Sequence, residues 1–128
     1  MISKEKNDYL SCYLQDFFYC HLINQRNVSS QTIESYRDTF RLLLKYIANG
    51  KKKKPVDLKL SDLSASVILK FLDYLEKERG NCIRTRNIRL AAIRSFMNYL
   101  AFKMPNRLSE IRQISAIPMK RFDRPILD

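Results

Sequence analysis

The chain has few of the residues that form turns: two glycines and four prolines among 128 residues. A fold made of many short β-strands needs frequent Gly and Pro between the strands, so these counts argue against an all-β protein and favour helices. Histidine occurs once, as His21, and tryptophan is absent. A single histidine leaves little material for a histidine-based zinc site or a triad with a histidine base, and we expect neither a metal nor a cofactor.

Cysteines and long apolar runs are also scarce. Cys12, Cys20 and Cys82 are odd in number and lack metal-ligand spacing, so we expect free thiols. No apolar run approaches the roughly 20 residues that span a bilayer. The first residues, MISKEKNDYL, also lack the apolar core of a signal peptide. We therefore expect a cytoplasmic protein without a membrane partner.

What the chain has in excess is positive charge, with a net charge of +11 at pH 7. The excess lies late in the sequence, because residues 81–128 include ten basic and three acidic residues. Between residues 81 and 109 there are six basic residues and no Asp or Glu: Arg84, Arg86, Arg89, Arg94, Lys103 and Arg107. Such a field indicates nucleic acid or an acidic membrane as a partner, although basic helix faces are often merely solvated.

Apolar residues recur at helical spacing in four long segments, which predicts an all-α protein. The segments are residues 7–25, a second beginning after Ser29 or Ser30 and ending at Asn49-Gly50, a third opened by Ser61 or Ser64 and ending near Gly80, and residues 84–103. A short last helix is expected from Leu108 to Ile114. Six residues are predicted to share one core: Phe40, Leu44, Phe71, Leu75, Ile93 and Phe96.

The segment from residue 84 to residue 103 divides into two faces. One face carries Leu90, Ile93, Phe96, Met97 and Leu100, and the opposite face carries Arg84, Thr85, Ile88, Ala91, Ala92 and Ser95. Because the second face is small and cationic, a DNA groove could approach it closely while arginines reach phosphates or base edges. This face is the predicted nucleic-acid surface.

Two other segments are distinctive without indicating catalysis. The run KKKKP, residues 51–55, is typical of a solvated loop, with a phosphate contact or a localisation signal as alternatives. The last residues, 117–128, have the composition of a linker, and apolar residues resume at Ile126, which suggests a further domain downstream. The chain has no Gly-rich phosphate loop, no paired carboxylates and no Cys–His arrangement. We therefore expect no enzymatic activity from this chain.

Several of these motifs, in this order, resemble a known family. The matching stretches are Ser30-x-Thr32-Ile33-x-x-Tyr36-Arg37, Asp62-Leu63 before Ile68-x-x-Phe71-Leu72, Arg84-Thr85-Arg86-Asn87-x-Arg89-Leu90 with its continuation to Leu100, and the linker segment from Ile117-Pro118 to Arg124-Pro125. Together they resemble the N-terminal core-binding (SAM-like) domain of tyrosine recombinases, the phage-integrase class. The resemblance covers roughly residues 8–127.

The resemblance implies an orthogonal bundle of four main helices, arranged as two crossed hairpins, over residues 1–116, followed by a linker over 117–128. It implies that the second and fourth helices face the major groove of duplex DNA, and that other recombinase protomers bind the same DNA. Carried onto this chain, the DNA-binding residues are Thr32, Ser35, Arg84, Thr85, Arg86, Ile88, Arg89, Ala92 and Ser95. The family's catalytic residues belong to a C-terminal domain, so no catalytic residue is assigned here.

Three functions remain open at this stage. The favoured one is the DNA-binding module of a site-specific recombinase or integrase of a mobile element, which acts in DNA integration and recombination. The alternatives are a stand-alone helical transcription regulator and a basic helical adaptor for protein partners or RNA. A reading frame that continues beyond Asp128 for about 170 to 200 residues would favour the recombinase. A stop codon directly after Asp128 would favour the transcription regulator.

Overall fold

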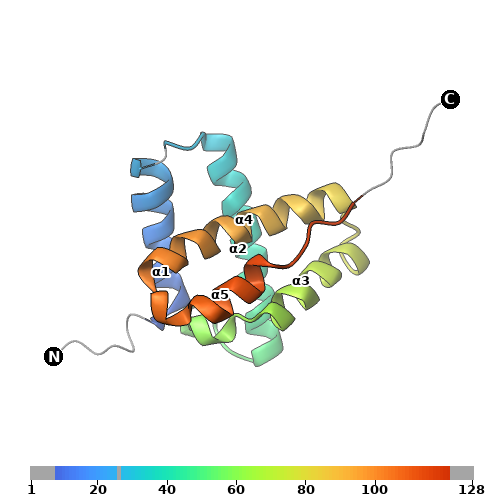
Figure 1. Cartoon of the computed structure of the whole chain (residues 1–128). Coiled ribbons are helices and arrows are strands. Elements are labelled where there is room, and N and C mark those ends of the chain that lie inside the picture. Colours follow the sequence, from blue (N-terminus) through green and yellow to red (C-terminus); the bar gives the residue numbers. More distant parts are fainter. Residues whose placement is uncertain (1–7, 26, 122–128) are drawn as a thin grey trace.

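The computed structural model describes residues 8–25 and 27–121, and these residues form helices joined by short turns (Figure 1). The main elements are α1 (Leu10–Asp16), the π-helical η2 (Phe17–Gln25), α2 (Ser30–Lys51), α3 (Ala65–Lys77), α4 (Ile83–Lys103) and α5 (Leu108–Ser115). Three short 3-10 turns connect them: η3 (Pro55–Asp57), η4 (Leu60–Asp62) and η5 (Pro105–Arg107). The predicted all-α class is confirmed.

The helix starts follow local chemistry that the sequence made visible. Ser29 Oγ accepts a hydrogen bond from the Thr32 backbone N–H at 3.2 Å, and Ser64 Oγ accepts one from Val67 at the same distance. Each serine satisfies an amide of the first helical turn that has no partner within the helix. After α3, Gly80 adopts φ +67°, a conformation that glycine tolerates without strain. These caps fix where α2 and α3 begin and where the chain turns after α3.

The end of α2 differs from the prediction of a stop at Asn49-Gly50. The helix continues through Gly50 to Lys51, and Lys52 adopts the left-handed conformation with φ 55°. The Lys53 backbone N–H then donates to the Ala48 carbonyl oxygen at 3.0 Å. The helix therefore ends one residue beyond Gly50, because the terminal carbonyls find their donors in the lysine run itself.

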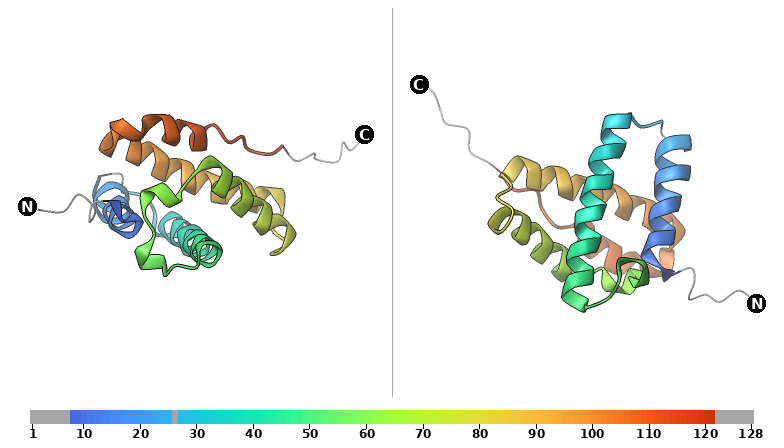
Figure 2. Two further views of the ribbon diagram at one scale, coloured as in Figure 1. Left: turned by 90° about the horizontal axis from the view of Figure 1, so that it is seen from below. Right: turned by 180° about the vertical axis from the view of Figure 1, so that it is seen from behind.

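The helices form two adjacent pairs that cross each other. Segment α1 with η2 runs beside α2, and α3 runs beside α4, as both views of Figure 2 show. Helix α4 lies across α2 and also contacts α3, α5 and η2. Because neighbours cover it on several sides, eight of its 21 residues are buried and seven more are half-buried. It is therefore the central element of the fold.

The core is a continuous apolar cluster with an aromatic centre. The ring of Phe17 lies 5.2 Å from that of Phe96 and 6.1 Å from that of Phe40, measured between centroids. Five of the six predicted core residues are buried, and the sixth, Leu44, is half-buried and packs against the others. This part of the prediction is confirmed, because helical periodicity identifies the inward faces of α2 and α3 directly.

The lysine run is tied to the fold through Asp62. Lys51 Nζ lies 3.2 Å from Asp62 Oδ1 and Lys53 Nζ lies 3.4 Å from Oδ2, while the Lys59 backbone N–H donates to Oδ2 at 2.8 Å. Burial alone would raise the pKa of Asp62, but the Lys59 amide and the two ammonium groups outweigh it and lower the pKa below its usual value. Two of the four lysines therefore support the loop before α3.

Asp62→Asn is expected to lower the free energy of unfolding by about 1 to 3 kcal/mol at pH 7, because it weakens hydrogen bonds to charged donors. The folded pKa lies below the unfolded one, so this stabilisation is fully present above pH about 4 and is lost as the pH falls through the folded pKa. Urea titrations of both proteins between pH 7 and pH 3 should show the difference shrinking on acidification. Asp57→Asn, an exposed change in the same loop, is the matched control.

Candidate nucleic-acid interface

Apart from Lys103 at its end, the exposed part of α4 is a narrow stripe along one side of the helix. We call it the α4 stripe, and it consists of residues spaced three or four apart: Arg84, Ile88, Ala91, Ser95, Asn98 and Phe102. All are exposed except Ser95, which is half-buried, and none is acidic. The stripe is mixed in chemistry, with a cation at its start, apolar or small groups at its centre and an aromatic ring at its end.

The α4 stripe lies beside the N-terminal half of α2 because an arginine joins the two helices where they cross. Arg89 Nη1 donates to the Ser35 carbonyl oxygen at 3.3 Å and to Thr39 Oγ1 at 3.1 Å. Ser35 is half-buried at this crossing, and Thr32, one turn earlier, is also half-buried. The crossing thus brings Arg89 of α4 against Ser35 of α2, with Thr32 one turn away, where α4 lies across α2 in Figure 1.

The nine predicted site residues differ in exposure. Arg84 and Ile88 are exposed, the latter by 45%. Five are half-buried: Thr32, Ser35, Thr85, Arg89 and Ser95. Arg86 and Ala92 are buried, at 4% and 0% exposure. The assignment of Ala92 to the outer face of α4 is therefore wrong, because α4 packs on more of its circumference than a two-faced helix does.

Arg86 makes structural contacts within the protein and does not project into solvent. Its Nη1 donates to the Pro118 carbonyl oxygen and to Asn87 Oδ1, each at 3.0 Å. Burial lowers the pKa of its guanidinium, with the carboxylate of Glu76 acting in the opposite direction. The Nη1 group thus joins α4 to Pro118, whereas the buried Nε has no hydrogen-bond partner among the described residues, and Arg86 lies in the fold beneath the α4 stripe.

Asn87 and Arg94 extend this contact along the chain that follows α5. We call residues 117–120 the connector. Asn87 Nδ2 donates to the Lys120 carbonyl oxygen at 2.8 Å, and its Oδ1 accepts from the Lys120 N–H at 3.0 Å. Arg94 Nη2 donates to the Ile117 carbonyl oxygen. Lys120 Nζ also pairs with Glu76 at 2.8 Å, so side chains of α3 and α4 hold the connector along α4.

These contacts change the interpretation of the six basic residues between residues 81 and 109 as a surface for a polyanion. Of these six basic residues, four have polar partners inside the protein: Arg86, Arg89, Arg94 and Lys103, the last at 3.6 Å from Asp16. Each of the three arginines donates to a backbone carbonyl, and a sequence does not show which carbonyls will serve as acceptors. Arg84 is the exposed arginine of α4 and has no ion pair within the described ranges.

Thr85 occupies the start of α4, where its hydroxyl oxygen lies 3.4 Å from Cys82 Sγ. This hydrogen bond is the main cause of a lowered pKa of the Cys82 thiol. All three cysteines are free and exposed, which confirms the expectation of free thiols. Within residues 8–25 and 27–121, no group of His, Cys, Asp and Glu is arranged to hold a metal ion.

The fold and the charge define the chain as a small, basic, all-helical domain. The model of the phage integrase N-terminal SAM-like domain matches residues 16–103, and the chain belongs to this family. The match spans α2, α3 and α4 and includes the crossing described above. In the part of the chain that the structure describes, no helix is long and apolar enough to cross a bilayer.

Two curated relatives come from Sinorhizobium fredii. A putative integrase/recombinase, y4rC, is 43% identical over 123 residues, which is 96% of this chain and 37% of the relative. A second putative integrase/recombinase, y4rD, is 43% identical over 112 residues, 88% of this chain and 40% of the relative. The chain thus spans well under half the length of these relatives. No solved structure matches it significantly.

Proposed function

We propose that this chain is the DNA-binding module of a site-specific tyrosine recombinase. The observation that carries the proposal is the acid-free α4 stripe beside the half-exposed Thr32 and Ser35 of α2, in an integrase-family chain with a net charge of +11. A helix pair of this kind suits the major groove, which is wide enough to admit an α-helix. Arg86 and Ala92 support this surface from beneath and do not contact DNA.

Different contacts would come from the exposed residues. Arg84 would neutralise a phosphate or reach a base edge, and the hydroxyls of Thr32 and Ser35 would donate to phosphate oxygens. Ile88 would contact apolar groups, such as the thymine methyl, and supplies no hydrogen bond. With so few hydrogen bonds to bases, affinity should lie near the non-specific range of about 10⁻⁴ to 10⁻⁶ M at physiological salt.

The complete protein would act in DNA integration and recombination. The names of both relatives and the share of their length that the chain covers favour a parent whose catalytic domain follows the connector. In that parent the present chain clamps duplex DNA together with other protomers, and the downstream domain cuts and rejoins the strands. This proposed action on DNA is consistent with a cytoplasmic location of the protein.

Arg84→Gln is expected to weaken duplex binding and to flatten the dependence of log K on log[salt] by about one unit, because one fewer counterion is released. Fluorescence anisotropy of a labelled duplex across a salt series measures this slope. Arg112→Gln is the matched control, since Arg112 is an exposed arginine on α5. A reduced slope for Arg112→Gln with an unchanged slope for Arg84→Gln would place the DNA on another face.

A further inference from the structure

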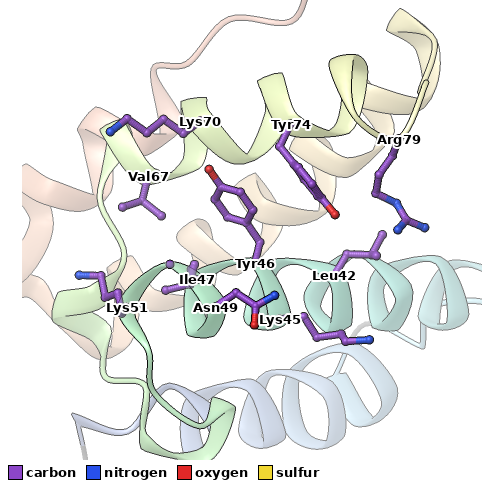
Figure 3. A pocket seen from close by; sticks show the side chains of 11 residues that line it. Leu42, Lys45, Tyr46, Ile47, Asn49, Lys51, Val67, Lys70, Tyr74 and Arg79 are labelled. Carbon is purple, nitrogen blue, oxygen red and sulfur yellow. The ribbon is translucent and has the colours of Figure 1, made fainter.

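A groove of about 760 Å³ lies between α2 and α3, away from the α4 stripe (Figure 3). Tyr46 from α2 and Tyr74 from α3 point toward each other within it, and their ring centroids are 5.0 Å apart. Tyr46 also contacts the buried ring of Phe71 at 5.6 Å, whereas both tyrosines remain half-exposed. The groove therefore contains an aromatic pair anchored to the core and accessible from outside.

The charge of the groove has one sign. Lys45, Lys70 and Arg79 are exposed along its two sides, and no lining residue is acidic. None of these three has an ion pair within residues 8–25 and 27–121, in contrast to the lining residue Lys51, which pairs with Asp62 at 3.2 Å. Two cationic walls around an aromatic floor form an attractive site for an anion that also has a flat face.

We propose that this groove binds single-stranded nucleic acid, with phosphates on Lys45, Lys70 and Arg79 and a base stacked on the tyrosine pair. A basic groove with aromatic rings is the usual arrangement for binding single strands, because an unpaired base offers its flat face. In a duplex that face is covered by neighbouring bases. The volume is also in the range of small-ligand sites, about 300 to 1,000 Å³, which suits one or two nucleotides.

The groove continues the surface of α2 that carries Ser35. Leu42, Tyr46 and Asn49 follow Ser35 at intervals of seven, four and three residues, so all four lie on one side of the helix. A strand in the groove would therefore pass from the C-terminal half of α2 toward the crossing with α4. Binding here goes beyond duplex recognition and does not depend on it.

The test uses the full chain and a fluorescein-labelled dT15 oligonucleotide in anisotropy titrations. Tyr74→Leu keeps an apolar group but removes the stacking surface, and affinity for dT15 should fall roughly 5- to 150-fold. Lys45→Gln with Lys70→Gln changes two exposed side chains and cannot disturb the core. This double variant should flatten the dependence of log K for dT15 on log[salt] by about 1.4 units. Tyr19→Leu alters an exposed tyrosine outside the groove and should leave dT15 binding unchanged.

The inference is overturned if neither groove variant changes dT15 binding, because the oligonucleotide then binds elsewhere. It is also overturned if poly-glutamate binds more tightly than dT15 and loses affinity in Tyr74→Leu, which would identify an acidic polypeptide as the occupant. A matched duplex separates the two proposals. Duplex binding without dT15 binding contradicts the groove alone, and dT15 binding without duplex binding contradicts the proposed function alone.

Discussion

Phe96→Ala is expected to lower the free energy of unfolding by about 3 to 5 kcal/mol. Phe96 is 1% exposed and its ring lies 5.2 Å from that of Phe17 and 5.4 Å from that of Phe40, so it joins α4 to η2 and α2. Truncation removes buried apolar surface and leaves a cavity between three elements that can collapse only partly. Urea denaturation followed by circular dichroism measures the loss.

Phe102→Ala provides the matched control on the same helix. Phe102 is 88% exposed, so removing its ring should change stability by less than about 0.5 kcal/mol. The two substitutions delete the same atoms, and only their burial differs. A loss under about 1 kcal/mol for Phe96→Ala would mean that the inward face of α4 has been assigned incorrectly.

Ile88→Glu is expected to weaken duplex DNA binding by at least about tenfold. Ile88 is 45% exposed at the centre of the α4 stripe, so a glutamate there would face the phosphates at the proposed interface. Placing like charges together across an interface costs several kcal/mol when they are desolvated, and less when water screens them. The fold should tolerate the change, because the side chain already contacts solvent. Anisotropy at fixed salt measures the loss.

Leu69→Glu separates the local effect from the loss of net charge. Leu69 is 47% exposed and lies on α3, so the substitution has the same charge and nearly the same exposure at a different face. It should lower duplex affinity only slightly through the weaker overall field. Equal losses in Ile88→Glu and Leu69→Glu would show that binding depends on total charge and would remove the support for the α4 stripe.

The helices and their starts were predictable because their causes are local. Ser29 and Ser64 cap α2 and α3 through hydrogen bonds three residues away, and the inward faces of these helices repeat at the helical period. The predicted end of α2 was wrong, and its cause is also local. The Asn49-Gly50 pair suggested a helix end, but the carbonyls of the last turn were closed by amides of the lysines that follow.

The surface of α4 was less predictable because its neighbours come from distant parts of the chain. Arg86 and Arg94 bind backbone carbonyls of the connector, 32 and 23 residues away in sequence. Every residue has a backbone carbonyl, so the residue types do not show which carbonyls will accept these hydrogen bonds. A pattern with a single packing face places Ala92 on the outer side of α4, whereas α2, α3, α5 and η2 all contact this helix. The sequence predicts a surface for a polyanion from these arginines, and it does not reveal that several of them make internal contacts.

The groove between α2 and α3 could not be recognised from the sequence for a related reason. Tyr46 and Tyr74 are 28 positions apart and belong to different helices, and each alone has the spacing of an ordinary packing residue. The sequence shows neither that their rings meet nor that Lys45, Lys70 and Arg79 surround them. Only the pairing of α2 with α3 brings these residues to one place.

The attachment of the connector to α4 matters to anyone who fuses another protein to this one. Asn87 holds Lys120 by both its N–H and its carbonyl oxygen, so a fusion partner joined after Arg121 begins beside the first turns of α4. Trimming the chain at residue 116 to shorten such a fusion would remove the buried Ile117 and leave Arg86 and Arg94 without their carbonyl acceptors. We would therefore end any expressed domain no earlier than Lys120 and place flexible linker residues only beyond it.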